Sequence, residues 1–255
     1  MTGGLVSITF RDLEANEIID LVKKSGLTAI EWGGDVHVPH GDIEKARKVC
    51  RETKKAGLEV AAYGSYYRVG CKKGDIGCSF DTVLDTAVAL DAPLIRVWAG
   101  NKGSESADEV WWEKVIKESR EIADKAEQEN IKIAYEYHGG TLTDTNETAI
   151  KLLKEVDHSN IYTYWQPPHH MSVKNRQQDL KNVLPWLTNM HVFYWESHDR
   201  FPLKNGAEDW QKYFSEVLKT DRNHYAMIEF VQNGDPEQFL NDAEVLKSLI
   251  NDCEN

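Results

Sequence analysis

Short apolar runs alternate with longer amphipathic runs from one end of the chain to the other. The short runs are rich in β-branched and aromatic residues, as strands are, whereas the longer runs repeat apolar positions at helical spacing among Lys and Glu. Repeated alternation of this kind predicts parallel strands joined by helical crossovers. The expected strands are residues 5–10, 29–32, 59–64, 94–98, 131–137, 161–165, 190–194 and 226–231.

Glycines mark two of the expected helix ends. Gly26 and Gly57 occur in the similar segments Lys-Ser-Gly-Leu-Thr and Lys-Ala-Gly-Leu-Glu, each of which leads into a strand. The length of 255 residues is close to the roughly 250 typical of an eight-stranded barrel. An open parallel sheet is less favoured, because no Gly-rich nucleotide-binding turn follows the first strand. We therefore predict an α/β fold, a single-domain (β/α)8 TIM barrel, with one domain over residues 1–255.

Four polar residues stand at or near the ends of the later strands. Glu136, Gln166 and Glu229 close three of them, and His191 lies within the apolar run at 190–194. In a TIM barrel the carboxyl ends of the strands meet at one mouth, where catalytic residues from different strands converge. Two carboxylates, an imidazole and an amide oxygen in one place would suit a divalent cation. The pattern therefore predicts a metal-dependent enzyme.

Composition narrows the choice of partners. The net charge is −12, so we expect no binding to nucleic acid, whose phosphates such a surface repels. We also expect no membrane association, because no apolar run approaches the roughly 20 residues that a membrane span requires. The four cysteines form no CxxC pair. Reduced thiols and the absence of a signal-peptide pattern predict a cytoplasmic protein.

Three segments resemble a known family. Residues 30–39 (IEWGGDVHVP), 94–100 (LIRVWAG) and 136–145 (EYHGGTLTDT) are similar to the segments after strands two, four and five of the xylose isomerase-like barrels. Within that group the sugar phosphate isomerase/epimerase family is the nearest, and the resemblance covers nearly the full length. Each segment alone is moderately specific. Together, in this order and at this spacing, they are strong for the superfamily and weak for the substrate.

The resemblance implies a particular metal site. Members hold the ion with a Glu ending strand five, an Asp ending strand six, a His on strand seven and a Glu ending strand eight, and Glu136, His191 and Glu229 match. Gln166 stands where the family has its Asp. An amide oxygen can still bind a hard cation, but it brings no charge, so we expect weaker binding than an Asp would give. We expect one divalent ion, with Mn²⁺ favoured and Co²⁺, Mg²⁺ or Zn²⁺ as the other choices.

The same resemblance implies the chemistry. Glu136 and Glu229 would be the catalytic pair, which removes a proton from a carbon beside a carbonyl and returns it through an enediolate. A divalent ion stabilises such an intermediate. The expected activity is that of a sugar or sugar phosphate isomerase or epimerase. The expected partner is therefore a small sugar or its phosphate.

Further residues are expected around this centre. Arg96 lies inside a strand, where a charge must be paired, and Glu31 or Glu136 is its expected partner. Paired aromatics at 111–112 and 213–214 allow a homo-oligomer surface, although helix packing explains them equally well. The expected substrate contacts are His37, His138, His169, Arg200, Trp32 and Trp98.

Three other functions compete with this interpretation. A dehydratase of keto-inositols would remove the same kind of proton and then expel hydroxide, with His169 or His37 as the acid. A degenerate barrel without catalysis is motivated by Gln166. A DNA-repair endonuclease of the same superfamily is disfavoured, because strands three and four end in Ala-Tyr-Gly-Ser and Val-Trp-Ala and lack the extra metal-binding histidines.

Overall fold

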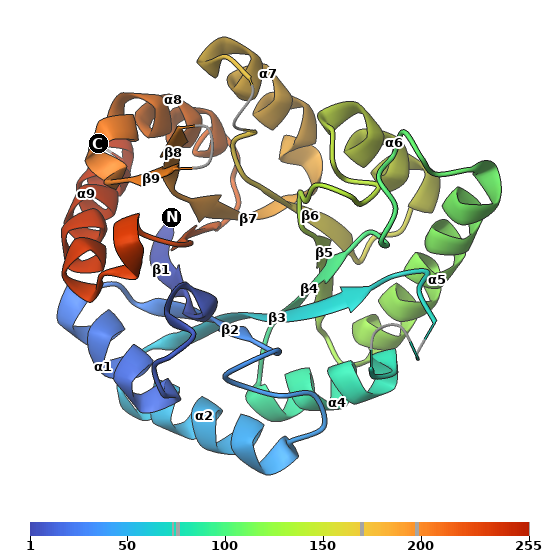
Figure 1. Ribbon diagram of the computed structural model, residues 1–255, viewed down its shortest axis with the longest axis horizontal. Helices are drawn as coiled ribbons and strands as arrows, with labels where there is room; N and C mark the ends of the chain where they lie inside the picture. Colours follow the sequence, from blue (N-terminus) through green and yellow to red (C-terminus); the bar gives the residue numbers. More distant parts are fainter. Residues whose placement is uncertain (73, 75–76, 169–170, 197–198, 255) are drawn as a thin grey trace.

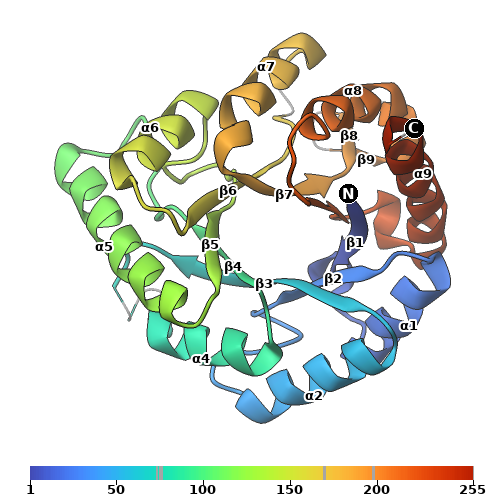
Figure 2. The same ribbon diagram turned by 180° about the vertical axis from the view of Figure 1, so that it is seen from behind.

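The computed structural model describes residues 1–72, 74, 77–168, 171–196 and 199–254. Parallel strands close into a barrel in the order β1-β10-β7-β6-β5-β4-β3-β2, and helices surround it (Figures 1 and 2). The barrel strands are β1 (Thr2–Val6), β2 (Ala29–Gly33), β3 (Glu59–Arg68), β4 (Leu94–Trp98), β5 (Lys132–Tyr135), β6 (Ile161–Trp165), β7 (Leu187–Val192) and β10 (Tyr225–Ile228). The predicted (β/α)8 TIM barrel is confirmed.

Helices follow the strands and form the outer layer. They are α1 (Ala15–Ser25), α2 (Ile43–Lys55), α4 (Phe80–Leu90), α5 (Glu109–Gln128), α6 (Asn146–Val156), α7 (Val173–Val183), α8 (Ala207–Val217) and α9 (Pro236–Glu254). Gly26 and Gly57 adopt left-handed φ angles of 74° and 79°, as expected of glycines at helix ends. After β7, two short antiparallel strands, β8 (Tyr194–Glu196) and β9 (Asp199–Phe201), form a hairpin.

The first strand differs from its predicted position. The prediction was residues 5–10, whereas β1 ends at Val6 and Ser7–Phe10 form a 3-10 helix. Ser7 explains the turn, because its Oγ accepts a hydrogen bond of 2.9 Å from the Gly33 N–H. The same oxygen lies 3.0 Å from Nδ1 of His37. These bonds tie the end of β1 to the loop after β2 and end the strand early.

Alternation along the strands decides which side chains enter the barrel. Neighbouring residues of a strand point to opposite faces. In β2, Glu31 therefore points into the barrel, where it meets Arg96 of β4, while Trp32 points outward. Trp32 is fully buried among the apolar residues between strands and helices. The structure thus places Trp32 in the outer core, whereas the sequence analysis expected it at the substrate pocket.

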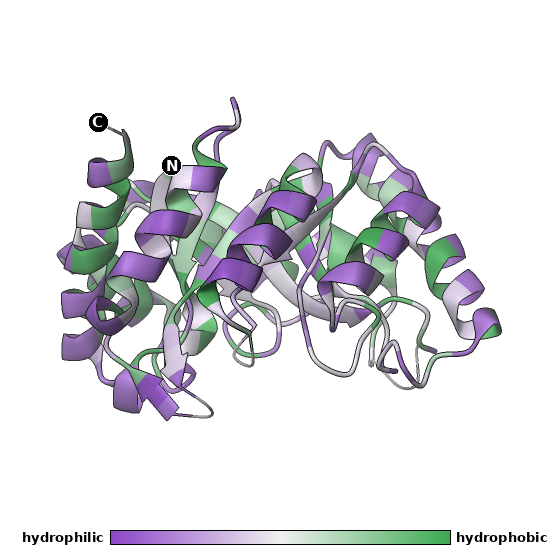
Figure 3. Cartoon of the chain, turned by 90° about the horizontal axis from the view of Figure 1, so that it is seen from above, coloured by the Kyte–Doolittle hydropathy of each residue, from purple (hydrophilic) through white to green (hydrophobic). Residues whose placement is uncertain are grey.

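The main hydrophobic core lies between the barrel and the helices. Figure 3 shows hydrophilic and hydrophobic residues alternating along these helices, as expected of helices with one buried face. Trp112, Tyr213 and Phe214 are buried in this layer, with exposed fractions of 8%, 1% and 0%. Helix packing therefore accounts for most of the aromatics that had allowed a homo-oligomer surface. Among the described residues, no helix combines the length and the apolar character needed to cross a membrane.

Gly64 in β3 makes room for the buried ion pair of Glu31 and Arg96. A Cβ atom at Gly64 would lie 2.7 Å from Nη2 of Arg96 and 2.9 Å from Oε1 of Glu31. We predict that Gly64→Ala lowers the free energy of unfolding by about 1–3 kcal/mol, because both charged groups must shift inside a packed interior. Urea unfolding measures this change. Gly139→Ala is the matched control, since a Cβ there meets nothing within 4 Å. Equal stability of the two variants would contradict the prediction.

Candidate active site

Three ionisable side chains converge inside the carboxyl end of the barrel. Glu136 follows β5, His191 lies in β7 and Glu229 follows β10. One ligand atom from each lies within 4.8 Å of the others. The exposed fractions of Glu136, His191 and Glu229 are 4%, 0% and 7%, so water is largely excluded from all three. The tertiary structure therefore brings together three of the four residues that the sequence analysis assigned to a metal.

Gln166 completes this group from the end of β6. Its Oε1 lies 2.8 Å from Nδ1 of His191. Its amide nitrogen donates to the backbone oxygen of Tyr137 at 2.8 Å, which fixes the orientation of the amide. The same Nδ1 of His191 lies 3.3 Å from Oε2 of Glu229 and 3.6 Å from Oε1 of Glu136. The oxygen of Gln166, and not its nitrogen, therefore faces the two glutamates.

The donor set fits a divalent cation. Two carboxylates, one imidazole nitrogen and one amide oxygen are ligands that first-row divalent ions and Mg²⁺ accept. The nearby charges also fit a divalent cation. Three negative charges come from Glu31, Glu136 and Glu229, and Arg96 contributes one positive charge. The remaining charge of −2 inside a nearly dry barrel matches one divalent ion. We call Glu136, Gln166, His191 and Glu229 the candidate metal centre.

Arg96 lies beneath this centre and pairs with two carboxylates. Its Nε donates to Oε1 of Glu31 at 2.6 Å, and its Nη1 donates to Oε2 of Glu136. Its side chain is 1% exposed, and Glu31 is fully buried. Trp98 also donates, from its indole nitrogen to Oε2 of Glu136 at 2.5 Å. With two donors on one oxygen, Glu136 has a fixed orientation that leaves Oε1 facing His191.

The buried charges shift the pKa values of their neighbours. Burial alone would raise the pKa of Glu31, but Arg96 and His191 lower it to about 2. Burial alone would lower the pKa of His191, but Glu229 and Glu31 raise it to about 10. Burial also opposes ionisation of Glu229, yet His191 outweighs this effect and the pKa of Glu229 is lowered. Without a metal ion, the site therefore favours an imidazolium among carboxylates.

Aromatic and basic side chains lie above Glu136. The indole of Trp98 stacks on the imidazole of His138, with ring centroids 4.2 Å apart. The guanidinium of Arg68, at the end of β3, lies 4.2 Å from the centre of the Trp98 ring. The indole nitrogen of Trp98 therefore contacts Glu136, while its ring packs against the imidazole of His138 and the guanidinium of Arg68. The structure thus brings Trp98 and His138, two of the expected substrate contacts, together beside Glu136, and it adds Arg68, which was not among the expected residues.

Arg200 comes from the hairpin after β7. Its guanidinium lies 4.2 Å from the ring centre of Phe230 and 5.2 Å from that of Trp195. Phe230 directly follows Glu229 and has a left-handed φ of 57°, with its N–H donated to Oγ1 of Thr9 at 2.9 Å. Such a φ is rare for a bulky residue and is held here by the surrounding structure. Arg200 thus lies beside the turn that directs Glu229 into the barrel.

Besides Trp32, two more of the expected substrate contacts are not found at the candidate metal centre. His37 is 3% exposed, and its ring nitrogens lie 3.0 Å from Oγ of Ser7 and 3.1 Å from the backbone oxygen of Leu13. Both nitrogens are therefore engaged by the protein, and His37 ties the loop after β2 to the loop after β1. His169 lies outside the described residues.

Some residues around the centre were not singled out by the sequence analysis for a role of their own. Tyr164 donates to Oε2 of Glu31 at 2.8 Å, and the ring of Tyr66 lies 4.9 Å from the guanidinium carbon of Arg96. A usable signal existed for Tyr164, because it precedes Gln166 by two and must share its face of the strand. No such signal existed for Tyr66, since an irregular register between Gly64 and Tyr67 breaks the alternation in β3.

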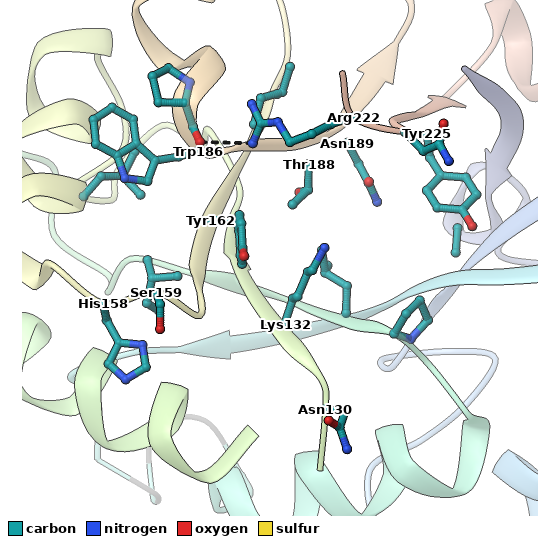
Figure 4. A pocket seen from close by; sticks show the side chains of 18 of the residues that line it. Asn130, Lys132, His158, Ser159, Tyr162, Trp186, Thr188, Asn189, Arg222 and Tyr225 are labelled. Atoms are coloured by element: carbon teal, nitrogen blue, oxygen red, sulfur yellow. Dashed lines mark hydrogen bonds between the residues drawn. The ribbon is translucent and has the colours of Figure 1, made fainter. Parts of the chain in front are cut away.

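A separate cavity of about 1080 Å³ opens at the amino ends of the strands (Figure 4). Its walls include Lys132, Tyr162, Asn189, Arg222 and Tyr225. Among the described residues that line it, none belongs to the candidate metal centre, and Asp157 and His158 do not form part of a metal-binding group of three. Catalytic residues of TIM barrels lie at the opposite, carboxyl end. The candidate active site is therefore the group of buried side chains around His191.

Comparisons with known proteins show the family to which this barrel belongs. The profile of the family described as "Xylose isomerase-like TIM barrel" matches residues 19–249. A "3-dehydroshikimate dehydratase" of Bacillus anthracis is 24% identical over 263 residues, which cover 90% of this chain and 91% of that protein.

Solved structures show the same fold. A probable 3-DHS dehydratase involved in petrobactin synthesis, from Bacillus anthracis, has a TM-score of 0.81 at 21% identity and covers 97% of this chain and 99% of its own. A D-psicose 3-epimerase, solved in the presence of D-fructose, has a TM-score of 0.72 at 14% identity and covers 97% and 98%. At these identities the two structures support the fold and leave the reaction open.

The raised pKa of His191 predicts a pH-dependent stability of the metal-stripped protein. The pKa in the folded protein, about 10, exceeds the ordinary value of 6.5. The resulting stabilisation is therefore complete below about pH 6.5 and is lost as pH rises through about 10. Urea unfolding with a chelator present, at about pH 6 and about pH 10, should show a larger loss of stability for the wild type than for His191→Gln. Parallel losses in the two proteins would refute this prediction.

Proposed function

The chain belongs to the xylose isomerase-like TIM barrel family. We propose that it is a divalent-metal-dependent sugar or sugar phosphate isomerase or epimerase. The position of two carboxylates is the main support for this proposal. Two buried carboxylates, Glu136 and Glu229, have oxygens 3.6 and 3.3 Å from Nδ1 of His191. They come from β5 and β10, which lie on the two sides of β7 and β6 in the barrel. A substrate carbon bound between them would meet a carboxylate on each side.

This arrangement suits proton transfer beside a carbonyl group. One glutamate removes the proton from the carbon, and the other returns a proton to the opposite side or to the neighbouring carbon. A divalent ion held by the candidate metal centre would supply the positive charge that stabilises the enediolate formed in between. Closure of the barrel around these residues excludes water and strengthens each electrostatic contact.

The two glutamates differ in their surroundings, and this difference assigns their roles. Arg96 and Trp98 both donate to Oε2 of Glu136, which occupies that oxygen and fixes the position of the carboxylate. Among the described residues, the ion pair recorded for Glu229 is with His191. A metal ion would take over Nδ1 of His191 and leave Glu229 with fewer donors than Glu136. We therefore assign the first proton removal to Glu229.

The mouth of the site suits an anionic substituent on the substrate. The guanidinium groups of Arg68 and Arg200 lie on aromatic rings, and neither has an ion pair with a carboxylate among the described residues. An Arg held on a ring still presents its N–H donors to a phosphate or a carboxylate. This observation supports a sugar phosphate over an uncharged sugar, in a protein whose net charge is −12.

A dehydratase is the second candidate, because a curated relative at 24% identity bears that name. Removal of water from a hydroxy ketone begins with the same proton abstraction, so the same glutamates would serve. The substrate named for the relative is a ring carboxylate, and Arg68 and Arg200 would suit its charge equally well. The departing hydroxide would need an acid, and we assign this role to His138, whose imidazole stacks on Trp98.

Metal titration tests the candidate metal centre directly. We predict one Mn²⁺ site per chain in isothermal titration of the metal-stripped protein. Glu229→Gln should weaken it at least about tenfold, because a charged ligand is lost, and Gln166→Asp should tighten it, because a charge is gained. Glu105→Gln, an exposed carboxylate outside the site, is the control and should bind as the wild type does. Absence of binding by Mn²⁺, Co²⁺, Mg²⁺ and Zn²⁺ would favour the degenerate barrel.

A substrate screen then separates the two reactions. We predict that the protein converts ketose phosphates or ketoses into an epimer or isomer. Chromatography of the product measures this turnover. Glu229→Gln should lower kcat by about 10²–10⁴-fold, the usual range for loss of a general base. A cyclic hydroxy-keto carboxylate such as 3-dehydroshikimate is the competing substrate, since loss of water from its ring leads to an aromatic product that absorbs ultraviolet light. Turnover of that compound alone would replace the isomerase with the dehydratase.

A further inference from the structure

Glu31 is a buried charge that the proposed proton transfer does not use. It is fully buried inside the barrel, one layer below the candidate metal centre. A carboxylate in such a place is unfavourable unless every oxygen is well paired. The ion pair with Arg96 accounts for Oε1 of Glu31. The burial of the other oxygen, Oε2, is explained only if further donors bind it.

Oε2 of Glu31 belongs to a column of hydrogen bonds with a fixed direction. The side-chain amide of Asn189 donates to the hydroxyl oxygen of Tyr164 at 2.9 Å. The hydroxyl hydrogen of Tyr164 is then donated to Oε2 of Glu31 at 2.8 Å. Arg96 donates to the other oxygen at 2.6 Å. Because an ionised carboxylate only accepts hydrogen bonds, any further neighbour of Glu31 must be a donor.

That further neighbour is His191. Its Nε2 lies 3.7 Å from Oε2 of Glu31, slightly beyond hydrogen-bond length. Among the described residues, this buried Nε2 has no hydrogen-bond partner. The ring of Tyr164 packs edge-on against the His191 ring, with centroids 5.0 Å apart, and so restricts its rotation. The other nitrogen, Nδ1, faces the candidate metal centre.

We propose that Glu31 is a positioning residue that keeps a hydrogen on Nε2 of His191 and thereby leaves Nδ1 as the nitrogen that binds the metal. This inference rests on the proposed function, since it assigns how one ligand of that site is held. A small shift of the ring or the carboxylate closes the contact. Carboxylates that hold a metal-binding imidazole in this way fix both its tautomer and its orientation, and their loss weakens metal binding about 10–100-fold.

Glu31→Gln is the informative variant because it keeps the shape and changes the donors. One of the two oxygens becomes an NH₂ group, and because Arg96 can only donate, the amide oxygen faces Arg96 and the NH₂ takes the position of Oε2. An NH₂ at the position of Oε2 would donate to Nε2 of His191 and favour the opposite tautomer. We expect Mn²⁺ affinity to fall about 10–100-fold, as measured by isothermal titration.

Tyr164→Phe is the second variant, in case Glu31→Gln does not fold. It keeps the charge of Glu31 and removes only the donor that holds Oε2, so it should lower Mn²⁺ affinity less than Glu31→Gln does. Tyr135→Phe is the matched control, because its buried hydroxyl bonds to Ser119 in the outer layer. The control should lose stability while its Mn²⁺ affinity stays unchanged.

Nitrogen-15 NMR of histidine-labelled protein loaded with diamagnetic Zn²⁺ reads the tautomer itself, with His191→Asn to assign the signal. We expect hydrogen on Nε2 in the wild type and a changed or mixed state in Glu31→Gln. A wild-type ring with hydrogen on Nδ1, or unchanged Mn²⁺ affinity in both Glu31→Gln and Tyr164→Phe, would show that Glu31 serves only Arg96. No Mn²⁺ binding by the wild type would instead overturn the metal-dependent function, and with it the purpose assigned to Glu31.

Discussion

The buried guanidinium of Arg96 is the interaction on which the interior of the barrel depends. It stands between Glu31 and Glu136, and all three side chains are at least 95% removed from water. A single charge in that place would be strongly unfavourable, so the three groups are stable only together. Gly64 leaves the space that they need. Removing Arg96 would leave both carboxylates without their cation in the closed barrel, and removing either carboxylate would leave one guanidinium N–H without its acceptor.

This ion pair also gives the site its chemical character. By binding Oε2 of Glu136, Arg96 leaves Oε1 turned toward His191 and Glu229. The excess of negative charge that remains above Arg96 favours a proton on His191 when no metal is bound and a divalent ion when one is. The same residues therefore explain the raised pKa of His191 and the fit of the donor set to a metal. One constraint produces both properties.

The two ends of the barrel have separate roles in this interpretation. The carboxyl end holds the buried glutamates, with Trp98, His138 and two arginines around the mouth. The amino end has a cavity of about 1080 Å³, but polar side chains that line it are engaged by neighbouring protein atoms, as Tyr225 is by Glu59. Asn189 and Tyr164 connect the wall of that cavity to Glu31.

The sequence by itself determined the fold and named the residues of the candidate metal centre. The alternation of apolar runs predicted the barrel because each strand needs apolar residues on its outer face and each helix needs one apolar face. Strand ends predicted Glu136, Gln166, His191 and Glu229 because parallel strands share one mouth. The sequence also predicted that Arg96 pairs with Glu31 or Glu136, because a charged residue inside a strand must have a partner.

Only the tertiary structure decided the positions that depend on neighbours far away in the chain. Trp32 lies outside the barrel, because its strand neighbour Glu31 takes the inward position to meet Arg96. His37 was expected at the substrate, yet Ser7 and Leu13 engage both of its nitrogens. The contact between Glu31 and Nε2 of His191 links β2 to β7 across the barrel. Such contacts follow from barrel closure, which no local pattern of residues encodes.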